Sequence, residues 1–281
     1  MTDAKSIPGF EERFAVVKGC RLRYFVGGPE RGAPLVLIHG LGGCAANWVD
    51  VAPLLSRRRR VLVPELPGHG RSAPLAAVPN LAVFADRIGE LAEREGMAPA
   101  AFVGHSLGAV VALRLALRRP EAVSALVLAA AAGISSTTRR AKWGLRILGI
   151  IGPRRLVAPW ADSVAASSLL RYTVFGRWGA SDPLILSRAA VDGFLEGTRL
   201  TTDSVSAARA VVTDDVRQDL GELRCPALVL WGARDNQLPV ADAFEFARRL
   251  DAPLRVIGDC GHLLIGERPD LCAAAIDDFL R

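Results

Sequence analysis

Apolar runs alternate along the chain with segments in which apolar residues recur at helical spacing. The helical spacing occurs at residues 47–56, 81–95, 107–118, 239–250 and 269–280. The runs between them are apolar at nearly every position, as in strands buried on both faces of a sheet. In chain order they are PLVLIHG, RVLVPELPG, AAFVGHS, SALVLAAA, ALVLWGARD and LRVIGDCGH. This alternation predicts a mostly parallel, doubly wound α/β sheet.

Two segments depart from the alternation. Near the N-terminus, FAVVKG and RLRYFVGG have the pattern of a two-stranded hairpin. From about residue 133 to 215 the chain has helical spacing but no convincing strand, and it contains Trp143, Trp160 and Trp178. We therefore expect a helical cap at 133–215, inserted into a core formed by residues 1–132 and 216–281.

Length and hydropathy indicate a folded protein with a large core, since the chain has 281 residues and 51% of them are hydrophobic. The N-terminal sequence MTDAKSIPGF has charges and a proline where a secretory signal would be apolar. The most apolar run, VSALVLAAAAGI, is about half of the roughly 20 residues that span a bilayer. We expect a cytoplasmic protein without stable membrane insertion.

Charge and cysteine spacing argue against several kinds of partner. The net charge of +6 comes mainly from arginines, and the densest group is RRRR at 57–60. This group has no interleaved aromatic residues, which favours a solvated connection over a nucleic-acid surface. The five cysteines are scattered singly, at Cys20, Cys44, Cys225, Cys260 and Cys272, without the spacing of a zinc site or a disulfide framework. We expect no nucleic-acid partner, no metal and no organic cofactor.

The stretch AFVGHSLGAV places Ser106 at the junction of an expected strand and an expected helix, with Gly104 and Gly108 on either side. A very sharp turn there strains the backbone, and side chains two residues away in either direction would collide with it. Such a turn would hold the hydroxyl above the sheet, near the positive end of the next helix. The pattern predicts a nucleophile elbow at Ser106.

A serine nucleophile needs a base, and the base needs an acid that orients it. His262, in DCGHLLIGERPD, lies between the last expected strand and the last helix. His105 is expected to point away from the hydroxyl, while His39 and His69 suit the bracing of loops. Asp235, in LVLWGARDNQLP, follows another strand, whereas the competing Asp214 and Asp215 end the expected cap. Ser106, Asp235 and His262 are the predicted catalytic residues.

An oxyanion would be held by backbone amides, which are fixed and do not titrate. One candidate is the amide of Leu107, at the start of the helix, and the other is that of Leu41 in HGLGG, with Gly42 as the alternative. A glycine-rich loop can also bind phosphate, but this loop lacks the Lys-Ser/Thr ending of a P-loop and the full spacing of a dinucleotide fingerprint.

Five motifs together resemble the α/β-hydrolase superfamily, in its branch of cap-bearing serine esterases and lipases: HGLGG, ELPGHGRS, GHSLG, WGARDNQLP and CGHLLIGERPD occur in the family's order and cover nearly the whole chain. The resemblance implies a Ser106–His262–Asp235 triad, oxyanion positions at Leu41 and Leu107, and a cap at about 133–215. Serine at the nucleophile position argues against the family's epoxide hydrolases and haloalkane dehalogenases, which carry aspartate there.

The function implied is hydrolysis of small-molecule carboxylic esters with small to medium apolar acyl chains. Lactonases, perhydrolases and hydrolases of carbon–carbon bonds in ring-fission products share these motifs. The last group usually has an aromatic residue where Leu263 stands, and uses a cap arginine for which Arg171, Arg177 or Arg188 could serve. A slow-turnover small-molecule receptor on the same fold is the alternative that is not an enzyme. The oligomeric state is not encoded in any motif.

The basic and apolar cap sequence RRAKWGLRILGIIGPRRLVAPW has two interpretations. Its apolar side chains can cover an acyl pocket, or they can lie on a membrane surface. We favour the pocket, with acyl contacts from Trp143, Leu145, Ile147, Leu148, Ile150 and Ile151.

Overall fold

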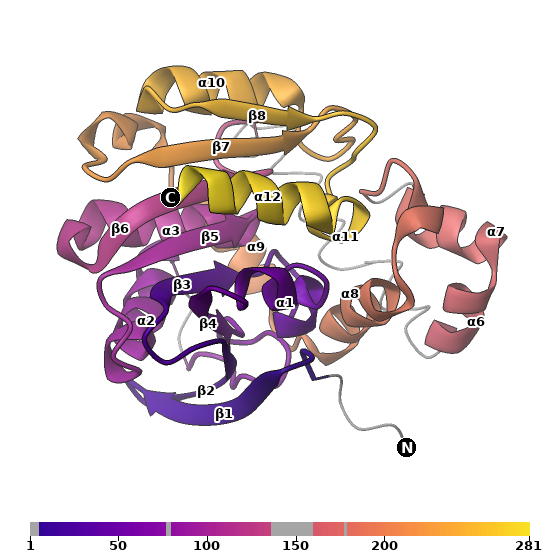
Figure 1. The fold of residues 1–281 in the computed structure, drawn as a ribbon, viewed down its shortest axis with the longest axis horizontal. Coiled ribbons are helices and arrows are strands. Elements are labelled where there is room, and N and C mark those ends of the chain that lie inside the picture. Colours follow the sequence, from indigo (N-terminus) through magenta and orange to yellow (C-terminus); the bar gives the residue numbers. More distant parts are fainter. Residues whose placement is uncertain (1–5, 77–79, 136–159, 177–178) are drawn as a thin grey trace.

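The computed structural model describes residues 6–76, 80–135, 160–176 and 179–281. Its centre is an eight-stranded sheet in the order β1-β2-β4-β3-β5-β6-β7-β8 (Figure 1). From β4 to β8 every neighbouring pair is parallel. The strands are β1 (Phe10–Val17), β2 (Cys20–Gly27), β3 (Ala33–Ile38), β4 (Arg59–Pro64), β5 (Ala100–His105), β6 (Val123–Ala129), β7 (Ala227–Gly232) and β8 (Leu254–Ile257). The predicted mostly parallel sheet is confirmed.

The expected N-terminal hairpin is also present. Strands β1 and β2 pair antiparallel through a two-residue turn, and β2 in turn pairs antiparallel with β4. The turn residues Lys18 and Gly19 have φ of 47° and 76°. Positive φ at both central positions matches the right-handed twist of paired strands, which is why this kind of turn joins hairpins.

Helices cover both faces of the sheet. In Figure 1, α1 (Ala52–Leu55) and α12 (Pro269–Phe279) lie in front of the strands, and α3 (Leu107–Arg118) lies behind them beside α2 (Leu81–Arg94). Helix α10 (Val240–Leu250) packs against β7. The central strands β5 and β7 are buried at every position. These features explain why the strand sequences are apolar throughout rather than alternating.

One predicted helix differs in the structure. In place of a helix over 47–56, a 3₁₀ turn at Ala45–Trp48 is followed by the short α1. Pro53 lacks an amide proton, and its ring would clash with the carbonyl four residues earlier. An α-helix therefore cannot run continuously through this segment.

Between β6 and β7 the regular secondary structure of the described residues is all helical, with loops between the helices. It contains α6 (Ala161–Ala166), α7 (Ser168–Arg171), a wide helical turn (Tyr172–Gly176), α8 (Arg188–Leu200) and α9 (Ser204–Thr213), with short 3₁₀ turns at Pro183–Ile185, Val216–Gln218 and Leu220–Glu222. Figure 1 shows α6, α7 and α8 together at one end of the sheet. The predicted acyl-pocket residues 143–151 lie outside the described residues, as do Arg177 and Trp178.

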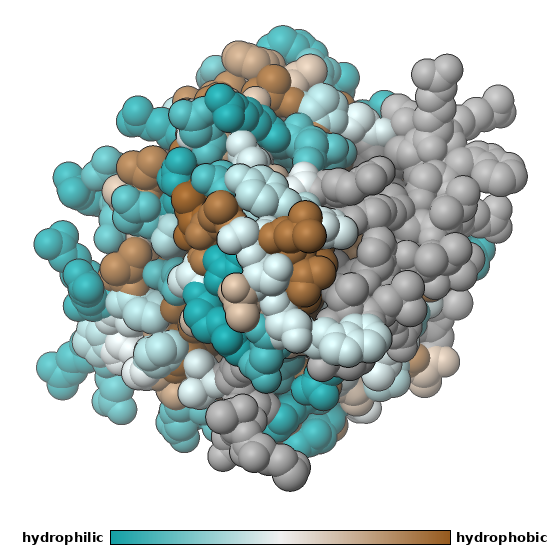
Figure 2. Space-filling model, turned by 90° about the vertical axis from the view of Figure 1, so that its right-hand side faces the viewer, coloured by the Kyte–Doolittle hydropathy of each residue, from teal (hydrophilic) through white to brown (hydrophobic). Residues whose placement is uncertain are grey.

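The side of the molecule that carries these helices is seen in Figure 2, where apolar and polar side chains are interspersed. Large apolar residues are exposed here, among them Leu169 of α7 and Trp160, the residue before α6, which are 75% and 60% exposed. Among the described residues, no helix is both long and apolar enough to cross a membrane. All five cysteines are free, and four of them are buried.

Candidate active site

Ser106 stands at a sharp turn between β5 and α3. Its φ and ψ are 54° and −112°, and it is partly exposed although the residues on both sides of it are buried. Its amide donates to the Ala129 carbonyl at the end of β6 over 2.9 Å, which anchors the turn to the sheet. A positive φ at a non-glycine residue is strained, and such strain persists only where the surrounding structure enforces it.

The two flanking glycines allow this turn to form. A Cβ at Gly104 would lie 2.2 Å from the carbonyl oxygen of Gly108, and a Cβ at Gly108 would lie 2.3 Å from that of Ile38. Both distances are far below van der Waals contact. The expected collisions are confirmed, and the second shows that β3 as well as β5 constrains the turn.

His262 and Asp235 meet through their side chains. Nδ1 of His262 lies 2.8 Å from Oδ2 of Asp235, and the Asp235 side chain is fully buried. The other carboxylate oxygen, Oδ1, accepts from the amides of Gln237 at 2.8 Å and Leu238 at 2.9 Å. An ionised carboxylate only accepts hydrogen bonds, so Nδ1 carries the proton and Nε2 keeps a lone pair. This tautomer is the one a general base requires.

Backbone contacts between the loops after β7 and β8 bring these two residues together. Amides of Ala233 and Arg234 donate to carbonyls of Ile257 and Cys260, each over 2.9 Å. The approach is close enough that a Cβ at Gly232 would lie 2.2 Å from the Gly261 carbonyl oxygen. The pairing of Asp235 with His262 thus depends on a glycine that the motifs did not single out.

His105 connects the serine turn to the histidine loop. Its ring nitrogen Nε2 lies 2.8 Å from the carbonyl oxygen of His262, and the two rings are 5.0 Å apart. His262 therefore packs against the neighbour of Ser106. The Ser106 hydroxyl and His262 make no hydrogen bond in this structure; in enzymes without a ligand this contact is often long and shortens in the complex.

The two candidate oxyanion amides lie on either side of the serine turn, one at the start of α3 and one in the loop after β3. Leu107 is the first residue of α3, so its amide has no carbonyl one turn earlier to bond. The Leu41 amide donates to no residue that the structure describes. Between Leu41 and β3, a Cβ at Gly40 would lie 3.3 Å from the Cβ of Ser106. This close approach places the HGLGG loop beside the serine.

His39 and His69 brace loops, as predicted. Nδ1 of His39 donates to the Gly40 carbonyl at 2.8 Å, and its Nε2 accepts from the Leu66 amide at 3.0 Å. Burial, together with the nearby His69, lowers the pKa of His39 to about 3. Burial also lowers the pKa of His69 to about 4. Both rings are neutral at ordinary pH.

Glu267, which was not among the residues predicted from the sequence, is 3% exposed and lies five residues after His262. Its oxygens accept from the amides of Gly261, Ser181 and Asp182. Burial raises the pKa of Glu267, and these three amides act in the opposite direction. A glutamate soon after the candidate histidine was a signal, but its partners 86 and 85 residues earlier in the chain were not predictable from any motif.

A family model described as the alpha/beta hydrolase fold matches residues 33–269, which contain every candidate site residue. The chain belongs to the α/β-hydrolase superfamily. A solved hydrolase from Pseudomonas aeruginosa PA01 has the same fold, with a TM-score of 0.79, 25% identity and coverage of 96% of this chain and 98% of that one.

Among curated relatives, a pimeloyl-[acyl-carrier protein] methyl ester esterase of Aromatoleum aromaticum is 32% identical over 88% of this chain and 98% of its own. A 2-hydroxymuconate semialdehyde hydrolase of Pseudomonas sp. is also 32% identical, over 89% and 87%. The dihydrolipoyllysine-residue acetyltransferase component of the acetoin cleaving system of Pseudomonas putida is 30% identical over 95% of this chain and 68% of its own. The family and its esterase relatives support a hydrolase-type enzyme.

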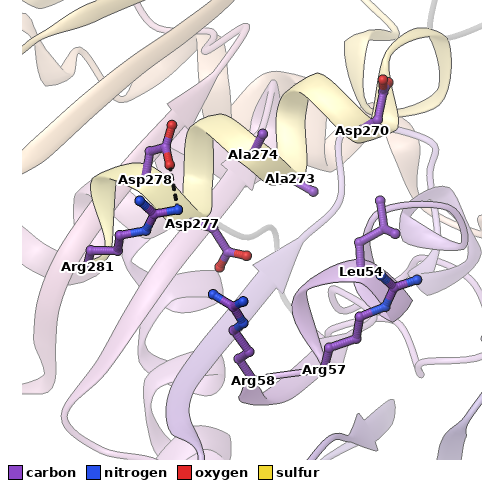
Figure 3. A pocket seen from close by; sticks show the side chains of 9 residues that line it. All are labelled: Leu54, Arg57, Arg58, Asp270, Ala273, Ala274, Asp277, Asp278 and Arg281. Atoms are coloured by element: carbon purple, nitrogen blue, oxygen red, sulfur yellow. Dashed lines mark ion pairs between the residues drawn. The ribbon is translucent and has the colours of Figure 1, made fainter.

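A hollow of about 380 Å³ lies between α1 and α12, outside the candidate site (Figure 3). Basic and acidic side chains line it, and none of the candidate residues does. Its Arg57 and Arg58 belong to the RRRR group, and both are exposed. Within the described residues, no group of three or more His, Cys, Asp or Glu side chains could hold a metal ion.

Proposed function

We propose that the protein is a serine hydrolase that cleaves carboxylic esters with small to medium apolar acyl chains. The contact between Asp235 Oδ2 and His262 Nδ1 at 2.8 Å carries the proposal, because it sets His262 in the tautomer of a general base. The strained backbone of Ser106 beside that histidine supports the role of nucleophile. The similarity to a methyl ester esterase supports an ester substrate.

In this mechanism, His262 Nε2 removes the proton of Ser106 as the hydroxyl attacks the ester carbonyl. The amides of Leu41 and Leu107 hold the oxyanion, and His262 then protonates the leaving alcohol. Asp235 stabilises the imidazolium that forms between these steps. Water repeats the cycle on the acyl-enzyme, with His262 again as the base. No step needs a metal or an organic cofactor.

We propose further that residues 133–215 form a cap over this site. The two ends of this segment are adjacent, as an insertion requires: a Cβ at Gly133 would lie 3.0 Å from Cγ2 of Val216. The segment also contacts the site, because the Gly179 carbonyl accepts from the His262 amide. The first observation supports the assigned boundaries, and the second supports a position against the site.

Hydrolysis of a carbon–carbon bond is the alternative function. The 2-hydroxymuconate semialdehyde hydrolase has the same sequence identity to this chain, 32%, as the methyl ester esterase. Two arginines considered for that chemistry already have other partners. Arg171 donates to the carbonyls of Ala165 and Leu186, and Arg188 pairs with Asp162 and Asp192. These contacts hold Arg171 against α6 and the segment before α8, and Arg188 against α6 and its own helix. For these two arginines they favour the ester over the ring-fission substrate, and Arg177 lies outside the described residues.

The test is a series of p-nitrophenyl esters with two to sixteen acyl carbons, assayed beside a lactone and a ring-fission dienoate. Each buried methylene contributes roughly 0.8 kcal/mol, about fourfold in kcat/KM, until the pocket is full. We expect kcat/KM to peak at about four to eight carbons, an estimate from that increment, and Ser106→Ala to lose turnover on the order of a millionfold.

Other outcomes of this series would change the proposal. Rapid use of only the lactone or the dienoate would reject the ester assignment. A rate that still rises at sixteen carbons, with activation at an oil interface, would support the membrane-surface interpretation of the cap. An acyl-enzyme that forms in a burst and then persists would indicate a receptor.

A further inference from the structure

Four contacts hold the backbone and ring of His262. Its side chain bonds Asp235, its carbonyl accepts from the ring of His105, and its amide donates to the Gly179 carbonyl over 2.5 Å. The fourth contact is indirect: the amide of Gly261, the residue before it, donates to Oε1 of Glu267 at 2.9 Å. The position of His262 therefore depends on the segment at 179–182 and on Glu267.

Glu267 also binds that same segment. Its Oε2 accepts from the amides of Ser181 at 2.7 Å and Asp182 at 3.2 Å. One carboxylate thus joins the loop that carries His262 to a segment between the helical turn at Tyr172–Gly176 and α8. All three donors are backbone amides.

The interface that this carboxylate closes is tightly packed. A Cβ at Gly261 would lie 2.3 Å from the Gly179 carbonyl oxygen, and a Cβ at Gly179 would lie 2.7 Å from Nε2 of Gln237 and 3.3 Å from the Cβ of His262. Segment 179–182 therefore lies directly against the histidine loop and the loop of Asp235. A shift of the segment would move His262 with it.

We propose that Glu267 is a positioning residue, whose carboxylate fixes segment 179–182 against the loop of His262 and so sets the histidine in register with Ser106 and Asp235. It does not touch the reacting atoms. This role rests on the proposed function, because it assigns Glu267 to the geometry of that same histidine. Its effect is expected on the chemical step more than on substrate binding.

The change that tests it is Glu267→Gln. It keeps the size of the side chain but replaces one of the two accepting carboxylate oxygens with an NH₂ group, which can only donate. The three buried amides can then not all be satisfied, and His262 loses its fixed position. A misplacement of about 1 Å costs on the order of a hundredfold in rate. We expect kcat to fall ten- to a hundredfold, an estimate from that figure, with KM changed by less than about threefold.

Asp242→Asn is the matched control. Asp242 is a buried carboxylate on α10 that accepts from the amide and the hydroxyl of Ser135, at 3.0 and 2.7 Å, and it touches neither His262 nor its loop. Both variants should lower Tm, Glu267→Gln because it leaves a buried amide unpaired and Asp242→Asn because it weakens the two hydrogen bonds that the carboxylate accepts. Only Glu267→Gln should lower kcat. An equal fall of kcat in both variants would show that Glu267 acts through stability alone and would overturn the proposal.

A second measurement needs no substrate, and so separates this proposal from the proposed function. The proton on His262 Nδ1, bonded to a carboxylate, is expected to give a low-field NMR resonance in the wild-type protein. We expect it to shift or broaden in Glu267→Gln and to stay unchanged in Asp242→Asn. Should Glu267→Gln not fold, Glu267→Asp, which keeps the charge but shortens the side chain, serves in its place.

The outcomes distinguish the two proposals. An unchanged resonance together with an unchanged kcat in the Glu267 variant rejects the positioning role. A wild-type protein that shows the resonance but hydrolyses no ester rejects only the proposed function.

Discussion

At the scale of single residues, the candidate site combines one strained backbone position with one side-chain pair. The positive φ of Ser106 belongs to the turn after β5, and the Asp235–His262 contact joins the loops after β7 and β8, which are more than a hundred residues further along the chain. The two other aspartates considered as the acid that orients the histidine have other partners. Asp214 pairs with Arg114 of α3, and Asp215 lies 2.6 Å from Arg217. The structure therefore favours Asp235 as the acid on the ground of its partner.

Replacing the acid gives the residue-scale prediction. Asp235→Asn presents an amide to Nδ1 of His262, which stabilises the tautomer with its proton on Nε2 and so removes the base. We expect kcat to fall on the order of ten-thousandfold, as in serine proteases with this change. Asp215→Asn is the control and should stay within about twofold of wild type, since an exposed ion pair contributes little. Ester hydrolysis at saturating substrate measures both variants, and damage by the control instead would show that the acid is misassigned.

At the scale of elements, the strand–turn–helix unit of β5 and α3 depends on glycines at both sides of Ser106. Motif spacing predicted this unit together with its bounds, because an apolar strand, a glycine-flanked serine and an amphipathic helix are all local patterns. Contacts between elements were not predicted from motif spacing. The approach of Gly232 to the loop after β8, and that of Gly179 to His262, became apparent only from the packed structure.

The prediction at this scale is that Gly104→Ala damages both stability and activity. The added Cβ would lie 2.2 Å from the Gly108 carbonyl and 2.3 Å from the Ala109 amide, so the turn must shift. We expect a loss of about 1–3 kcal/mol in the free energy of unfolding, the usual cost of overpacking. Activity should fall on the order of a hundredfold as Ser106 moves.

Gly221→Ala controls for the loss of a glycine, because a Cβ there would meet nothing within 4 Å. Its free energy of unfolding should be unchanged or higher by up to about 1 kcal/mol. Urea denaturation and ester assays compare the two variants. A fully active and stable Gly104→Ala would mean that the turn does not need a glycine at this position.

At the scale of the whole molecule, the free energy of unfolding depends on pH, because two buried histidines resist protonation in the folded protein. The pKa of His39 is lowered to about 3 and that of His69 to about 4, in both cases mainly by burial. Below the unfolded value of about 6.5, the unfolded chain binds protons that the folded chain does not, so the free energy of unfolding falls as pH falls. The loss continues until pH reaches the folded pKa values.

We therefore predict that the free energy of unfolding decreases between pH 7 and pH 5 by about 2 kcal/mol for each of these histidines. The buried Glu65 and Glu267 have raised pKa values and oppose this trend above about pH 4.5, so one histidine must be isolated by comparison. His69→Asn should lose about 2 kcal/mol of the pH dependence in urea titrations at the two pH values. An identical pH dependence in both proteins would show that His69 does not contribute.

The sequence alone determined which segments form strands and helices, because the periodicity of apolar residues reports the burial of each element. It also determined where a sharp turn must place Ser106, and which loops at one edge of the sheet carry Asp235, His262, Leu41 and Leu107. The division of residues 47–56 was missed, although Pro53 was the local signal for it. Only the tertiary structure decided what holds these loops together. Glu267 binds backbone amides, and the ring of His105 binds the carbonyl of His262; these contacts join segments that are distant in the chain. They could not be predicted, because backbone groups carry no signature in the sequence.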